Sequence, residues 1–324
     1  MPFTIAPGAF ALLAAASFAA SQVALRRGLV STTIVGGLLV SLCASLVVLT
    51  VAVALDPPIT ALDGRALALF ALAGIAAPGL ARWAAATGVK RLGPSAAVPI
   101  MQGARPLLAT AAAVLLLSEP LTAQRALGLG LIVAGGWSLS RRTAEDGDPR
   151  RSSGVDDLDA RHVGSDAHAG QTQATADRRY RSVLRRGAAF PLLAGLCYAS
   201  TDILIKQGLV LLPNPAVGAL TSTVAALITW SAVVVVSTRT RTQVKLGPDV
   251  GWQVLSGVLA GGALLCLSNA LRHGDVTLVS PILASQPLMV FLLSRLLLRD
   301  LERLRLATVV AGCSIVVGTL VVSR

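Results

Sequence analysis

Charged side chains inside long apolar segments are the residues best placed to do chemistry in this chain. Arg105 lies near the middle of an apolar segment, and Pro106 follows it directly. Gln102 is three residues earlier, so a helix would place it on the same face. An arginine at the centre of a bilayer costs about 2.5–3.5 kcal/mol on insertion scales. Arg105 therefore either binds an anionic group, such as a carboxylate or phosphate, or is locked in a salt bridge.

Asp202 is the acidic counterpart of Arg105, and we expect no other acid within an apolar segment. Tyr198 precedes it by one helical turn and Lys206 follows by one, so the three side chains form a stripe. The corresponding stripe in the first half of the chain contains Gln22. Three roles are open for Asp202: it neutralises Arg105, takes up a proton that drives transport, or pairs locally with Lys206.

Weaker candidates for a polar cavity are Gln286, the counterpart of Arg105 in the second half, together with Asn269, Trp83 and Ser285. Packing or hydrogen bonding between helices explains each of them equally well.

The sequence predicts no metal site, no cofactor and no enzymatic activity. Each of the four cysteines lies alone in an apolar segment, and the histidines fall in a polar loop or at a helix end. No P-loop or nucleophile elbow is present, which excludes ATP-driven pumping by this chain and disfavours an intramembrane enzyme.

The composition indicates a membrane protein. Of 324 residues, 54% are hydrophobic and 14% are charged, whereas soluble domains are about 45–50% apolar and about 25% charged. The apolar segments are continuous and only 4% of residues are aromatic, which disfavours a β-barrel and predicts an all-α fold. The net charge of +12 lies mainly between apolar segments, where it orients the chain and meets lipid headgroups rather than nucleic acid.

We expect ten transmembrane helices, because each of ten apolar segments can cross about 30 Å of hydrocarbon. The sixth is the shortest and could continue through Gln207. The segments are Phe3–Ala24, Thr33–Leu55, Ala66–Gly88, Pro94–Leu117, Thr122–Ser140, Ala188–Leu204, Pro215–Ser237, Gly251–Leu271, Val276–Leu298 and Leu304–Val322.

An internal repeat relates the two halves. Residues Phe10–Val30 align without gaps with Phe190–Val210, with eight identities in 21 positions. Each half contains five expected helices, an odd number, so the copies must have opposite orientations in the membrane. We therefore predict two inverted five-helix repeats, 1–140 and 188–324, joined by a disordered linker, 141–187, rich in Arg and Asp.

The stretch ARPLLATAAAVLLLSEPLTAQRALGLGLIVAGG closes the first half and resembles EamA-type members of the drug/metabolite transporter superfamily. The similar features are a mid-helix proline, an acidic residue 13 positions later and a glycine-bearing last helix. The resemblance covers the chain outside the linker. It implies an alternating-access carrier of small polar metabolites, often an exporter of amino acids or drugs.

Loop charges and this resemblance favour different orientations. Lys and Arg concentrate in the odd-numbered loops, which the positive-inside rule places in the cytoplasm with both termini outside. Members of the family are usually described with both termini in the cytoplasm.

The expected function is secondary transport of a small anionic or zwitterionic metabolite or drug across the cell's plasma membrane, and export is the expected direction. Protons are the candidate coupling ion. The expected oligomeric state is a monomer or a homodimer. A lipid or lipid-linked sugar flippase is the alternative within transport. A non-transporting membrane sensor is the alternative of another class.

Overall fold

The computed structural model describes residues 7–28, 31–56, 62–92, 94–131, 188–237 and 246–286, with a few isolated positions beyond these ranges. Within them every regular element is a helix, and six stretches are long and apolar enough to cross a membrane. The helices are α1 (Pro7–Gly28), α2 (Ile34–Leu55), α3 (Gly64–Gly74), the π-helix η1 (Ile75–Ala81), α4 (Arg82–Leu92), α5 (Pro94–Leu117), α9 (Ala189–Leu211), α10 (Pro215–Val236), α12 (Val250–His273) and α13 (Val276–Leu283).

Most expected segments that fall in these ranges are helical near the predicted bounds. Helix α5 has the expected ends, and α9 continues past Leu204 to Leu211. The last expected segment, Leu304–Val322, and the linker, 141–187, lie outside the described residues, as do parts of the fifth and ninth segments. The count of ten helices and the inversion of the repeats therefore stay predictions.

Two expected helices are less regular than the hydropathy pattern suggested. The third segment contains η1, where Pro78 lacks the N–H that a regular helix needs and the backbone widens to π geometry. The Trp230 indole Nε1 on α10 donates a hydrogen bond to the Pro78 carbonyl at 2.8 Å. The ninth segment begins with α13, which ends at Leu283; a turn follows at Ala284 and Ser285, and Gln286, Met289 and Val290 are again helical.

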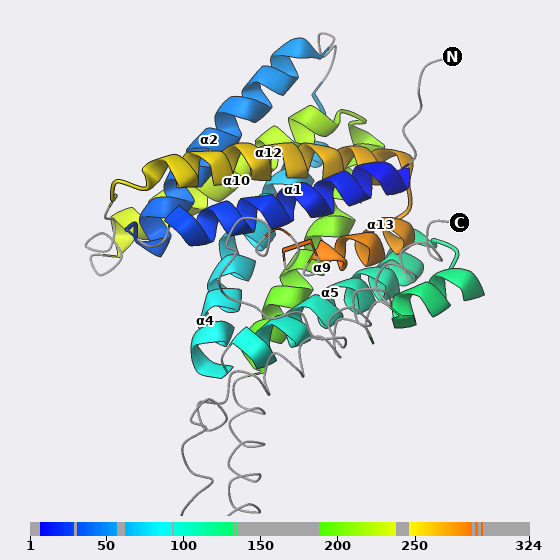
Figure 1. The fold of residues 1–324 in the computed structure, drawn as a ribbon. Helices are drawn as coiled ribbons and strands as arrows, with labels where there is room; N and C mark the ends of the chain where they lie inside the picture. The colour runs from blue at the N-terminus through cyan, green and yellow to red at the C-terminus, as the bar shows by residue number, and fades with distance from the viewer. Residues whose placement is uncertain are drawn as a thin grey trace, which may run out of the picture.

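Helix α12 joins the two halves of the chain by packing along α1 and against α2 (Figure 1). Small residues allow the close approach: the Ser45 hydroxyl donates to the Gly257 carbonyl at 2.7 Å, and the Ser21 hydroxyl donates to the Ser256 carbonyl at 2.8 Å. The small residues at Gly257–Gly261 therefore form a seam that contacts α2 directly.

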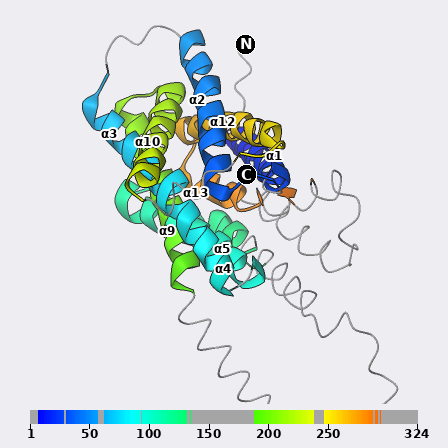
Figure 2. The same ribbon diagram turned by 90° about the vertical axis from the view of Figure 1, so that its left-hand side faces the viewer.

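Helices α3, α9 and α10 form a second group on the other side of α2 (Figure 2). The fully buried Phe70 ring fills the space left by Gly208 on α9 and Gly218 on α10. Helix α5 crosses α9, so a helix of the first half packs directly on one of the second half. This crossing positions the charged residues predicted from the sequence.

Candidate functional site

Arg105 and Asp202 form a buried ion pair between α5 and α9. The Arg105 Nη2 atom donates to Asp202 Oδ1 at 2.9 Å, and Arg105 Nε donates to Oδ2 at 3.2 Å. The Arg105 side chain is 9% exposed and the Asp202 side chain is fully buried. Of the roles left open by the sequence, the structure shows the one in which these two charges neutralise each other.

Close approach of the two helices makes this pair possible. A Cβ at Gly195 would lie 2.8 Å from the Ala104 Cβ and 3.1 Å from the Met101 carbonyl oxygen. Glycine at this position therefore allows α5 to lie against α9 two helical turns before Asp202. The Arg105 guanidinium also lies over the Tyr198 ring, 5.4 Å from its centroid, in a cation–π arrangement.

Lys206 does not pair with Asp202, although the two are one turn apart. Its Nζ atom donates to the Leu271 carbonyl at 2.9 Å and to the Gly274 carbonyl at 2.7 Å. These carbonyls lie at the C-terminal end of α12, where a cation complements the helix dipole. Lys206 thus fixes α9 to the connection between α12 and α13.

The same connection is held by the segment that follows α5. The buried Glu119 carboxylate accepts hydrogen bonds from the Val276 and Thr277 N–H groups, both at 2.9 Å, and so caps α13. Arg125 Nη1 donates to Asp275 Oδ2 at 2.9 Å. Glu119 therefore has a structural role, and the helix that it caps belongs to the other half.

The remaining sequence candidates lie in different surroundings. Gln22 is exposed on α1, Asn269 donates to the Leu265 carbonyl of its own helix at 3.0 Å, and Gln286 is buried. Gln102 lies on α5 one turn before Arg105, but its side chain is outside the description. Among the candidates, the structure thus brings together Arg105, Asp202 and Tyr198.

Two weaker candidates make packing contacts. The Trp83 ring meets the Phe190 ring edge to face, with centroids 5.7 Å apart. The Ser285 hydroxyl donates to the Ile282 carbonyl at 2.7 Å.

Arg82 is a charged residue near this site that the sequence analysis overlooked. It begins α4, directly after the π-helix, and lies within the third membrane-spanning stretch. Its side chain is half-buried, and α4 packs against α9, the helix that carries Tyr198 and Asp202. The signal was present in the sequence, because Arg82 is a cation inside an expected apolar segment.

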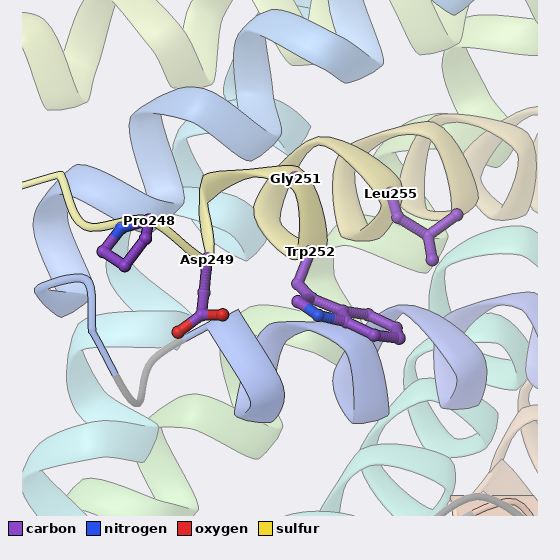
Figure 3. A pocket seen from close by; sticks show the side chains of 5 residues that line it. All are labelled: Pro248, Asp249, Gly251, Trp252 and Leu255. Atoms are coloured by element: carbon purple, nitrogen blue, oxygen red, sulfur yellow. The ribbon is translucent and has the colours of Figure 1, made fainter.

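A separate pocket of about 320 Å³ lies at the N-terminal end of α12 (Figure 3). Arg27 lies over the Trp252 ring there, 4.9 Å from its centroid, and this combination of residues at a helix end is typical of a membrane interface. None of the predicted site residues lines this pocket. Its lining residues are Pro248, Asp249, Gly251, Trp252 and Leu255.

Comparison with known proteins assigns the chain to a family. The sequence model of the EamA-like transporter family matches residues 7–141 and 185–324. The chain belongs to this family. No curated protein matches this EamA-like chain. A chain in a solved structure described as "Crystal structure of protein" shares its fold, with a TM-score of 0.64 and 15% identity, over 97% of this chain and 94% of the other.

Family membership confirms the resemblance seen in the sequence. The EamA-like chain is a multi-pass membrane protein whose regular elements, in the part that the structure describes, are all helices, and its family is one of membrane transporters of the drug/metabolite type. Arg105 lies in one matched stretch and Asp202 in the other, so the buried ion pair joins the two parts that the family model matches. Among the described residues, no group of histidine, cysteine and acidic side chains is suited to hold a metal ion.

Proposed function

We propose that this EamA-like protein is a secondary transporter that moves a small anionic or zwitterionic metabolite by alternating access between its two halves. The halves, 1–140 and 188–324, would act as inverted repeats around a site near the middle of the membrane. Export across the plasma membrane is the direction that the family resemblance favours. The chain itself would not hydrolyse ATP.

The observation that supports this proposal is the buried ion pair between α5 and α9. Removing one partner of such a pair typically costs about 3–5 kcal/mol, because the other charge is left uncompensated in an apolar medium. Relative motion of the two halves therefore requires something to replace the lost partner. A polar substrate, or a proton on Asp202, can supply that replacement as the transporter changes state.

Transport in proteoliposomes tests this role for the pair. Arg105→Ala and Asp202→Asn should each abolish counterflow of the transported compound, found by screening amino acids and dicarboxylates. Arg65→Ala is the matched control, because Arg65 is an exposed arginine at the start of α3 whose side chain has no ion pair within the described part of the chain. Normal transport by both site variants would remove the pair from the substrate site.

A further inference from the structure

The segment that follows α5 joins the first half of the chain to the second. Helix α5 ends at Leu117, and Ser118 has a φ of 53°, a left-handed conformation that is uncommon for residues other than glycine. Directly after this turn, Glu119 reaches α13, which packs on α5 (Figure 1). Its carboxylate accepts the two hydrogen bonds from the first turn of α13, and both bonds join one half of the chain to the other.

Helix α13 has a capping residue of its own, and the structure does not use it as a cap. Asp275 precedes α13 in the extended conformation of an N-cap (φ −77°, ψ 151°), where aspartate is among the preferred residues, but its side chain makes no capping hydrogen bond. Instead, Asp275 Oδ2 accepts from Arg125 Nη1 at 2.9 Å. The same Nη1 donates to the Thr277 hydroxyl at 2.8 Å. A carboxylate from the other half thus replaces the local cap.

The two contacts differ in burial. Glu119 is 8% exposed and Val276 is fully buried, whereas the Asp275 side chain is 37% exposed, so its pair with Arg125 is partly solvated and easily broken. Alternating access requires the halves to separate at each end in turn. Separation here would remove the Glu119 acceptor from the first turn of α13, and unpaired N–H groups are costly. Asp275, once released by Arg125, is already placed to accept from that turn.

We propose that α13 exchanges its cap during the transport cycle: Glu119 caps it while the halves meet at this end, and Asp275 caps it when they separate. This inference rests on the proposed transport function and assigns gating residues to it. Because the second cap replaces hydrogen bonds lost with the first, the closed and separated states stay near in free energy, as a reversible gate requires. Arg125 holds Asp275 away from the α13 N–H groups in the closed state.

Distances between spin labels measure the two states in the purified full-length protein in lipid nanodiscs. In a background without native cysteines, Leu121→Cys reports on the first half and Leu211→Cys on the second, and both positions are exposed. Pulsed electron spin resonance then gives the ratio of separated to closed molecules. Glu119→Gln should raise this ratio about fivefold or more, because the amide has one acceptor oxygen and no charge.

A matched control lies in another even-numbered loop. Asp56 is an exposed acid at the end of α2 that has no ion pair within the described ranges of the chain. Asp56→Asn removes one negative charge, as Glu119→Gln does, and should leave the ratio unchanged. An unchanged ratio in Glu119→Gln, or a single short distance in every variant, overturns the proposal.

Two substitutions of Asp275 separate cap exchange from a simple contact between charges. Both Asp275→Asn and Asp275→Ala break the pair with Arg125, but asparagine caps a helix as well as aspartate does and alanine caps it poorly. Cap exchange therefore predicts a ratio of separated to closed molecules about fivefold higher in Asp275→Asn than in Asp275→Ala. Equal ratios in these two variants overturn the exchange.

Two further measurements keep the result interpretable. If Glu119→Gln fails to give a monodisperse protein, Arg125→Gln frees Asp275 to cap α13 and must still raise the ratio; an unchanged ratio in that variant overturns the proposal. Normal counterflow by the wild type combined with unchanged distance ratios would leave the transporter proposal in place and remove only the cap exchange. Failure of the proposed function would appear instead as a wild-type protein without counterflow, whatever the distances show.

Discussion

The ion pair between Arg105 and Asp202 should affect stability and function in separable ways. Asp202→Ala leaves the Arg105 charge buried without a partner, so we expect a loss of about 3–5 kcal/mol in the free energy of unfolding. Replacing both residues together, as in Arg105→Met with Asp202→Leu, removes both buried charges and should restore most of that stability. The double variant should nevertheless fail to transport, because neither charge is left to exchange partners.

Unfolding of the purified protein in detergent measures the first effect. Asp275→Ala provides the comparison, because the carboxylate that it removes is 37% exposed and pairs with Arg125 nearer the surface. Such a partly solvated pair contributes only about 0–1 kcal/mol. Equal destabilisation by Asp202→Ala and Asp275→Ala would contradict an ion pair buried between α5 and α9.

At the scale of elements, two glycines on α12 should respond oppositely to the same substitution. A Cβ at Gly257 would contact the Ser41 carbonyl and lie 2.7 Å from the Ala44 Cβ on α2, whereas a Cβ at Gly262 meets nothing within 4 Å. Gly257→Ala should therefore cost about 1–3 kcal/mol by forcing the helices apart. Gly262→Ala should be neutral or gain about 0.5–1 kcal/mol from higher helix propensity.

Thermal unfolding of the two alanine variants, measured side by side in the same detergent, checks this pair of expectations. Because both substitutions lie on one helix, any general effect of alanine on α12 cancels in the difference. A Gly257→Ala protein as stable as Gly262→Ala would show that α12 does not pack on α2 through this seam.

The sequence predicts helices of this protein better than it predicts their irregularities and contacts. Hydropathy located α5 and α10 within a residue or two, because apolar length alone identifies a membrane-crossing helix. It missed the π-helix around Pro78, because a widened turn leaves the run of apolar residues unchanged. It likewise missed the turn at Ala284 and Ser285 that interrupts the ninth segment after α13.

The sequence predicted most residues of the site but not all of the contacts between them. Arg105 and Asp202 stood out as charges inside apolar segments, yet they are 97 residues apart, and their pairing depends on the crossing of α5 over α9 at Gly195. The capping of α13 by Glu119 likewise depends on a tertiary contact, between the segment after α5 and the start of α13. Arg82 was visible as a charge inside an apolar segment, but only the packing of α4 on α9 relates it to the site.

At the scale of the whole molecule, the odd-numbered loops between the expected spans lie near one another, and so do the even-numbered loops. The Asp249 N–H before α12 donates to the Ser31 hydroxyl between α1 and α2 at 3.2 Å. Elsewhere, the segments around Glu119, Lys206 and Asp275 gather through their hydrogen bonds to one another. Numbered along the expected ten spans, the first group belongs to odd loops and the second to even loops. One reporter in each group therefore reads the orientation of the protein.

Cysteine labelling in intact cells tests the orientation that the loop charges predict. Lysine and arginine are enriched in the odd loops, so these should lie in the cytoplasm. In a background without native cysteines, Leu62→Cys reports on an even loop and Leu246→Cys on an odd one, and both positions are exposed. A membrane-impermeant maleimide should label Leu62→Cys directly and Leu246→Cys only after permeabilisation.

The opposite labelling pattern would place the termini in the cytoplasm, as is usual in the family, and would require the concentrated arginines of the odd loops to lie outside. Because Leu246 follows Lys245 directly, its reporter lies beside the charges on which the prediction depends. Because the Asp249–Ser31 hydrogen bond fixes that loop to the connection between α1 and α2, an external Leu246→Cys would also place the end of α1 outside. A single pair of variants therefore decides between the loop charges and the family pattern.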